Sequence, residues 1–544
     1  MSNITYNFST FQVPQPELPV STLPASTQPA SPPTQDADVL LVSQPVNSKR
    51  SAPENDDAPQ PKRLKLSPIQ PSVSQHFVRT SQADKAKLDE LCSELVYGAN
   101  LAFSLVEHPC FRAFVSALRP GYIPPSAKTV GGKLLDQVHD KLQDDMKQNL
   151  EGKSVTIQQD GWSDIHNRPV VASCVNAQGK PYLIDAEDSK ANTKNAEYYK
   201  EKVIKSIDKA EKQYNCKVSS CVTDSAKNMV NMRSALEKDR PDIITYPCGA
   251  HNGNLLGEDC TPKGVMEHIK EVNKAFKNQH KPASLLAEMP GSVIPQLPGE
   301  TRWGSQRRAV ESFIKNRPFM ISIVQNHSDE FKQNIINKVM DINLFKNAKD
   351  LLDQLKPINI ALDKMQADDC VIADSCDIYL KLREEESLKP HAEKVEKRFK
   401  EAITPAHFAA HLLHPIYQGR GQSPEHKESA KSWLASRDPT FVPLAMAFQA
   451  KAKPFDLPSF FTKEATEGVD VIAWWTALNA SAELPPKFFA LMKQLHGASA
   501  SSASMERVFS TFGLNQTKLR NGLCTEKLSK LAFCHQMLRK AYQV

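Results

Sequence analysis

Strand-forming patterns occupy one stretch of this 544-residue chain, from about residue 154 to residue 246. Short β-branched runs there are separated by turn residues and by stretches with apolar residues at helical spacing. The order is three antiparallel-type strands, a helix, a parallel-type strand, a second helix and a final strand. We expect the strands at 155–159, 169–175, 182–186, 218–223 and 243–246. This order predicts an α/β fold of the α+β type around one mixed sheet.

Helical patterning dominates the regions on either side. From about 310 to 480 the sequence shows no strand alternation, so we expect an all-helical block inserted between the fifth strand and the last helices. The stretch from 81 to 152 should also be helical, with apolar stripes formed by Leu88, Leu91, Leu95 and Tyr97, by Phe103, Val106, Phe111, Phe114, Val115 and Leu118, and by Leu134, Leu135, Val138, Leu142 and Met146. The predicted divisions are 1–80, 81–152, 153–309, 310–485 and 486–544.

The first 80 residues are rich in Pro, Ser, Thr and Gln and poor in aromatic residues. Such a segment buries too little apolar surface to offset its ordering entropy, so we expect it to be disordered. It contains two basic clusters, Lys49-Arg50 and the group of Lys62, Arg63 and Lys65, separated by an acidic spacer that contains proline. This arrangement is typical of a bipartite nuclear import signal, which predicts a nuclear protein with an import receptor as partner. The alternative is a stray basic patch or a weak phosphate-binding arm.

Composition narrows the class of protein further. No apolar run approaches the ~20 residues that a membrane span needs, so we expect no membrane partner. The net charge of +6 is compatible with a nucleic-acid partner but is shared by many enzymes. The 11 cysteines include no Cys-x-x-Cys pair, which favours reduced, mostly buried thiols in the nucleus or cytosol.

Three acidic residues lie in settings suited to holding divalent metal ions. Asp160 and Asp224 each follow a short β-branched run, where a strand should stop, and Glu506 lies in a small-residue stretch compatible with a helix. Carboxylates delivered by strand ends and a helix can hold two Mg²⁺ or Mn²⁺ ions for phosphoryl transfer. The alternative is that these are ordinary solvated acidic residues at the ends of strands.

Nine fragments between about residue 85 and the C-terminus resemble, in order, the hAT superfamily of DNA transposases. They are AFSLVEHPCFRAFVSAL, DGWSD, VTDSAKNM, CGAH, TRWGSQ, HFAAHLLHPIY, the pair Trp474-Trp475, SSASMERVFS and TKLRNGL. The resemblance implies a ribonuclease-H-like domain interrupted by the helical block, with the first and fourth strands side by side. It also implies that Asp160, Asp224 and Glu506 form a catalytic triad that cleaves DNA and transfers the cut strand.

The same resemblance implies the partners and further site residues. We expect DNA, both transposon ends and target, and a homodimer or higher homo-oligomer. Residues 81–152 are expected to help bind DNA and assemble the subunits, and residues 486–544 to complete the core and dimerise. Trp162, His251, Arg302 and Trp303 are expected at the DNA, where the tryptophans can stack on a displaced base and Arg302 can pair with phosphate oxygens. The alternatives are that both tryptophans are core residues and that residues 81–152 only pack.

Two further features concern zinc and bear on whether the protein acts as a transposase. Cys248 and His251 have metal-like spacing, and Cys260 and His268 follow, but the tightly spaced second pair of a zinc site is missing, so we do not expect zinc. Members of the family usually open with a zinc finger, whereas His76 is the only candidate ligand before residue 85. Two functions therefore stay open: a metal-dependent transposase, and a host-adapted, non-catalytic nuclear protein that binds DNA and dimerises.

Overall fold

A computed structural model describes residues 80–163, 168–189, 195–299, 304–516 and 522–542 of the chain. The strands are β1 (Ser154–Ser163), β2 (Pro169–Ala177), β3 (Lys180–Asp188), β4 (Lys217–Thr223) and β5 (Ile244–Pro247). The helices up to the last strand are α1 (Gln82–Gly98), η2 (Phe103–Glu107), α2 (Pro109–Leu118), α3 (Ala127–Val130), α4 (Lys133–Leu150), α5 (Ala196–Tyr214) and α6 (Lys227–Asp239).

The remaining described elements are all helical. They are α7 (Gly249–Cys260), α8 (Lys263–Asn278), α9 (His280–Ala287), α10 (Gly304–Asn326), η3 (Ser328–Glu330), α11 (Gln333–Met340), α12 (Ile342–Met365), α13 (Ile372–Glu384), η4 (Glu386–His391), α14 (Ala392–Ala402), α15 (Pro405–Leu412), α16 (Pro424–Arg437), α17 (Phe441–Ala450), η5 (Pro458–Phe461), α18 (Lys463–Thr466), α19 (Val471–Ala482), α20 (Pro486–His496), α21 (Ala503–Asn515) and α22 (Thr525–Ala541). None of the helices in the described ranges is long and apolar enough to cross a membrane.

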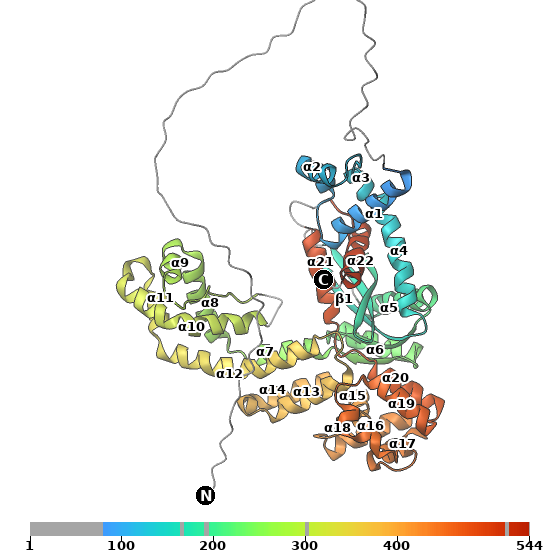
Figure 1. Cartoon of the computed structure of the whole chain (residues 1–544). Helices are drawn as coiled ribbons and strands as arrows, with labels where there is room; N and C mark the ends of the chain where they lie inside the picture. Colours follow the sequence, from blue (N-terminus) through green and yellow to red (C-terminus); the bar gives the residue numbers. More distant parts are fainter. Residues whose placement is uncertain (1–79, 164–167, 190–194, 300–303, 517–521, 543–544) are drawn as a thin grey trace, which may run out of the picture. The chain divides into compact units, whose positions relative to one another are not determined.

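The five strands form one mixed sheet in the order β3-β2-β1-β4-β5 (Figure 1). Strand β2 is antiparallel to both of its neighbours, β1 and β3, whereas β4 runs parallel to both β1 and β5. This is the predicted ribonuclease-H-like order, in which the first and fourth strands are neighbours. Each strand formed where a β-branched run was predicted, because such side chains pack well on a pleated, buried surface.

One local expectation about the sheet is wrong. Asp160 was expected to end its strand, but β1 continues to Ser163 and Asp160 pairs with Ala172 of β2. Only the pairing with β4 stops early, since its last paired residues are Gln158 and Val222. The strand continues because β2 still supplies hydrogen-bonding partners on the other side.

The buried apolar residues form two separate clusters. One joins the sheet to α4, α5, α21 and α22, and the other joins β5 to the helices from α7 to α20. Of the predicted stripes in the first helices, Leu135, Val138, Leu142 and Met146 of α4 are buried. The first two stripes are buried only in part: Tyr97 and Val106 are buried, whereas Leu91, Leu95, Phe114 and Leu118 are exposed and α2 buries no residue.

The helices from α7 to α20 lie in the chain between β5 and α21, which confirms the predicted helical insertion. Helix α21 returns to the sheet and contacts β1, β2 and α22 (Figure 1). The boundaries drawn between sequence regions remain predictions. The predicted import signal at Lys49, Arg50, Lys62, Arg63 and Lys65 and the predicted disordered tail lie outside the described residues.

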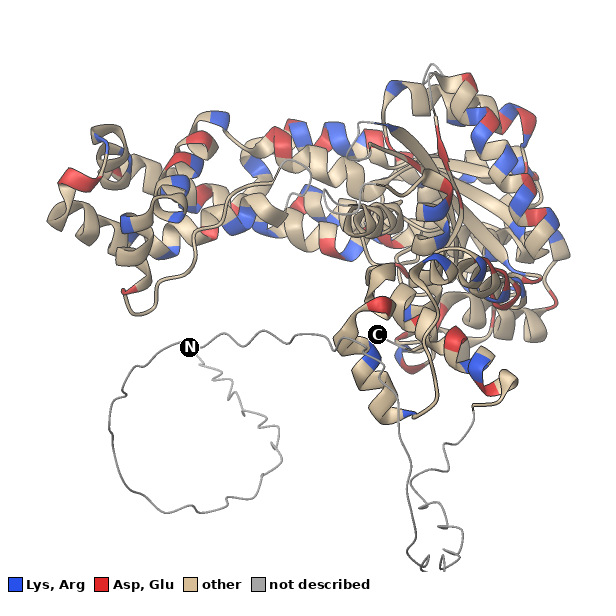
Figure 2. Cartoon of the chain, turned by 90° about the horizontal axis from the view of Figure 1, so that it is seen from above, with Lys and Arg blue, Asp and Glu red and all other residues tan. Residues whose placement is uncertain are grey.

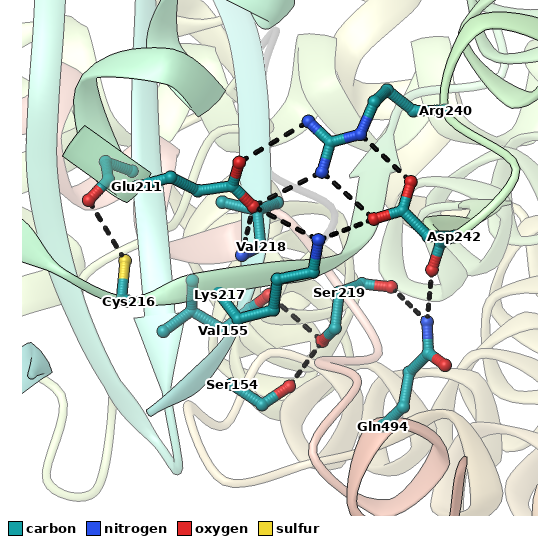
Figure 3. Close-up of polar contacts among 11 residues, drawn as sticks. Ser154, Val155, Glu211, Cys216, Lys217, Val218, Ser219, Arg240, Asp242 and Gln494 are labelled. Carbon is teal, nitrogen blue, oxygen red and sulfur yellow. Dashed lines mark hydrogen bonds and ion pairs between the residues drawn. The ribbon is translucent and has the colours of Figure 1, made fainter. Parts of the chain in front are cut away.

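Helix α20, the last helix before α21, is anchored at the starting ends of β4 and β5. The Gln494 side-chain amide donates hydrogen bonds to the carbonyls of Ser219 (2.5 Å) and Asp242 (2.9 Å) (Figure 3). Arg240 pairs with the Asp242 carboxylate at 2.9 Å and with Glu211 at 3.3 Å. This network holds the C-terminal part of the insertion against the sheet at the end opposite Asp160 and Asp224.

Candidate functional site

Asp160 and Asp224 follow the point where the pairing between the neighbouring parallel strands β1 and β4 stops. The last paired residues of β1 and β4 are Gln158 and Val222, and each aspartate lies two residues further along its own strand direction. Because side chains alternate along a strand, Asp160 points to the same side of the sheet as Gln158. The register therefore brings the two aspartates together, as the predicted fold required.

The backbone that carries Asp224 is held by a buried arginine. Arg233 of α6 is only 7% exposed, and its guanidinium donates to the Asp224 carbonyl (2.6 Å) and to the Thr223 hydroxyl (2.5 Å). The Asp224 carboxylate accepts a hydrogen bond from the backbone N–H of Ala226 at 3.0 Å. Together these contacts fix the turn between β4 and α6 on which Asp224 is presented.

Glu506 reaches the sheet on a buried segment of small residues. It lies in the first turn of α21, and the residues before it are buried: Ala498, Ser499, Ala500, Ser501, Ser502, Ala503 and Ser504. The backbone N–H of Ala500 donates to Cys370 (2.8 Å), and the Ala500 carbonyl accepts from the N–H of Gly249 (3.0 Å). The segment runs between the sheet and the inserted helices, where its small side chains are buried.

A glutamine of β1 forms hydrogen bonds with this segment. The Gln158 side-chain amide donates to the Ser501 carbonyl (2.9 Å) and the Ser499 hydroxyl (3.3 Å), and its oxygen accepts from the Ser504 hydroxyl. Tyr246 of β5 adds a hydrogen bond to the Ser499 carbonyl at 2.9 Å. The residue two before Asp160 thus sets the position of the helix that carries Glu506.

Replacing Gln158 by Leu should destabilise the protein by about 2–4 kcal/mol, because it leaves several buried polar partners unsatisfied. Gln159→Leu is the matched control, since the Gln159 side-chain amide is fully buried and makes no hydrogen bond to any described residue. We expect this control to be neutral or stabilising. Urea unfolding of both variants gives the comparison. Equal losses of stability would show that the hydrogen bonds of Gln158 do not hold the segment.

The negative charges of Asp224 and Glu506 act on Asp160. Burial, together with these two charges, raises the pKa of Asp160 to about 7. Three carboxylates supply hard oxygen donors, which fit Mg²⁺ or Mn²⁺, and a bound cation would relieve their repulsion. No group of three His, Cys, Asp or Glu side chains within the described ranges is arranged closely enough to enclose an ion.

Of the tryptophan and arginine residues predicted to contact DNA, the structure describes only Trp162. Trp162 of β1 stacks on Phe509 of α21, with ring centroids 6.1 Å apart and an interplanar angle of 11°. It also meets Phe512 edge-on, so it packs against the helix that carries Glu506. Its contact with DNA remains a prediction. Arg302 and Trp303 lie outside the described residues.

Cys248 and His251 belong to the N-terminus of α7. The Cys248 sulfur accepts long hydrogen bonds from the backbone N–H groups of His251 and Ser502, both at 3.4 Å, and burial raises the pKa of the thiol. The pair therefore caps α7 beside the small-residue segment. Gly249 is required there, because a Cβ on it would stand 2.6 Å from the Ser375 hydroxyl oxygen.

Sequence reasoning missed several residues that shape the site. Arg233, Gln158 and Tyr199 were not singled out. Burial raises the pKa of the Tyr199 phenol, as do the charges of Asp224 and Asp160, which places this side chain of α5 near both aspartates. Tyr199 showed only helical spacing in the sequence, and nothing distinguished it from a core residue.

The comparison with protein families gives one match. A family model described as a domain of unknown function, DUF659, matches residues 125–278. This domain is found in hAT-family transposase-like proteins. The matched range contains all five strands with Asp160, Asp224 and His251, but it ends before the helix with Glu506. A comparison with curated proteins found no match.

Proposed function

We propose that this protein is a hAT-like DNA transposase that cleaves DNA and transfers the cut strand in a metal-dependent reaction at Asp160, Asp224 and Glu506. One observation carries the proposal. The three acidic residues come from β1, from the end of β4 and from α21, yet the negative charges of Asp224 and Glu506 act on Asp160. The DUF659 match, a domain of transposase-like proteins, supports the same class.

In the proposed reaction, the residues of the candidate site have distinct roles. Asp160, Asp224 and Glu506 would together hold the divalent ions with their carboxylate oxygens. When bound, the ions would lower the pKa of the attacking water or 3′-hydroxyl and stabilise the negative charge that develops on the phosphate oxygens. Gln158 and the segment before α21 hold Glu506 in place, and Arg233 holds the turn of Asp224.

The test is cleavage of a pre-nicked DNA duplex tethered to the protein, which removes the need for sequence-specific end binding. We expect the wild-type protein to cut this DNA with Mg²⁺ or Mn²⁺ and to stop when EDTA is added. Asp224→Asn should lower the rate by about 1,000-fold, because an amide cannot replace the negative charge that binds the cation. Asp350→Asn, an exposed position on α12, is the control and should cut normally.

A protein that binds this DNA with metal present but never cuts it would contradict the enzymatic proposal. The non-catalytic alternative, a nuclear DNA-binding protein derived from a transposase, would then explain the chain. If Asp224→Asn cut as fast as the wild type, the cleavage would come from another site or from a contaminant.

A further inference from the structure

A small cavity of about 270 Å³ lies beside Glu506. Its walls come from α7, α10, α12 and α21, and its charged lining residues are Arg308, Asp363, Glu506 and Arg507. This volume is just below the ~300–1,000 Å³ of pockets that enclose whole small molecules. A cavity of this size suits a single phosphodiester group better than a complete nucleotide.

The two arginines of this cavity differ in whether they are already paired. Arg507 donates to the Asp368 carboxylate and to the Gln366 carbonyl (3.3 Å). Arg308 is exposed and has no hydrogen bond or ion pair with any residue in the described ranges. Its neighbour Arg307 is paired with Glu311 at 2.8 Å. Arg308 is therefore the cation at this cavity whose hydrogen-bonding capacity is unused.

The position of the Arg308 side chain is set by the first turn of α10. A Cβ placed on Gly304 would lie 3.7 Å from an Arg308 guanidinium nitrogen and 3.8 Å from the Asn359 side-chain oxygen. The guanidinium thus lies back along its own helix, the direction that long side chains on helices prefer. This orientation brings its donors to the cavity that Glu506 also lines.

We propose that Arg308 binds a phosphate of the DNA strand next to the bond that is cut, through the cavity beside Glu506. A guanidinium presents donors in a planar fork that matches two phosphate oxygens. Its positive charge also offsets the repulsion between DNA and the carboxylates of Glu506 and Asp363. This inference rests on the proposed function, and it adds a residue that contacts the substrate.

The experiment measures binding of a nicked DNA duplex by fluorescence anisotropy over a range of salt concentrations, with Ca²⁺ present. Arg308→Ala should weaken binding about 10- to 100-fold, as expected for the loss of a charged hydrogen-bonded pair. The slope of log affinity against log salt should fall by about 1, since one phosphate contact is lost. Arg308→Lys should keep the slope, and Arg307→Ala should behave as the wild type.

A second arm places the contact on the DNA. Replacing single phosphates around the nick by uncharged methylphosphonates should weaken wild-type binding at one phosphate close to the nick, and this replacement should cost Arg308→Ala almost nothing further. Independent effects at every phosphate, or an unchanged salt slope in Arg308→Ala, would overturn the proposal. Cleavage of the tethered duplex is scored separately, so a wild-type protein that binds but never cuts refutes the proposed function without deciding the role of Arg308.

Discussion

Lowering the pH from 7 to 5 is expected to destabilise this protein by about 6 kcal/mol through three buried histidines. Burial lowers the pKa of His407 to about 3, that of His414 to about 2 and that of His496 to about 3. In the unfolded chain each pKa returns to about 6.5, so the unfolded state binds more protons below that pH. The contribution of the neutral histidines to the free energy of unfolding is therefore complete above pH 6.5. It is lost as the pH falls to 5, by about 2 kcal/mol for each histidine.

Urea unfolding at several pH values measures this loss, and one variant assigns it. The His407 ring accepts a hydrogen bond from the Thr404 hydroxyl at 2.9 Å, and Asn can supply a similar acceptor without titrating. His407→Asn should remove about a third of the pH dependence, whereas His280→Asn, at an exposed position, should remove none. An unchanged pH dependence in His407→Asn would show that the buried histidines are not responsible.

Asp160→Asn should stabilise the protein by about 2 kcal/mol at pH 8 when no divalent ion is present. The raised pKa of Asp160, about 7, means that the folded state disfavours the charged carboxylate. The free-energy cost of charging Asp160 in the folded state is absent below about pH 4, grows as the pH rises to 7 and is complete above pH 7. Full burial would make it about 4 kcal/mol, but Asp160 is half-buried and solvent screening reduces the effect.

Thermal unfolding in EDTA at pH 8 and at pH 4 checks this prediction. The stabilisation should disappear at pH 4, where the carboxylate of the wild type is mostly protonated in the folded state. Added Mn²⁺ should stabilise the wild type but not Asp160→Asn, because only the wild type keeps the full set of carboxylates. A variant that is less stable than the wild type in EDTA at pH 8 would contradict the electrostatic account.

The sheet and the helical insertion could be predicted because their signals are local. Runs such as 155–159 and 218–223 combine β-branched residues with bounding turns, and both became strands. The same reasoning was only partly right for α1 and α2, where Tyr97 is buried but Leu91, Leu95 and Phe114 are exposed. An apolar stripe shows that a helix has a face to bury, but it does not show whether a partner lies against that face.

The site could be predicted only in part. The residues Asp160, Asp224 and Glu506 were found through fragments that resemble a family, and the strand register explains how the two aspartates meet. The role of Gln158 could not be predicted, because its partners lie more than 300 residues further along the chain. Arg308 gave no local signal either, since its position beside Glu506 depends on how α10 packs.

Binding of Mn²⁺ tests the central claim most directly, because it asks whether the three carboxylates form one cation site. Electron paramagnetic resonance reports free Mn²⁺ during a titration of the wild type, of Glu506→Gln and of the control Asp350→Asn. We expect the wild type and the control to bind Mn²⁺ and Glu506→Gln to bind it at least about 10-fold more weakly, a difference of about 1.4 kcal/mol. Equal Mn²⁺ affinity in the wild type and Glu506→Gln would contradict a site shared by Asp160, Asp224 and Glu506.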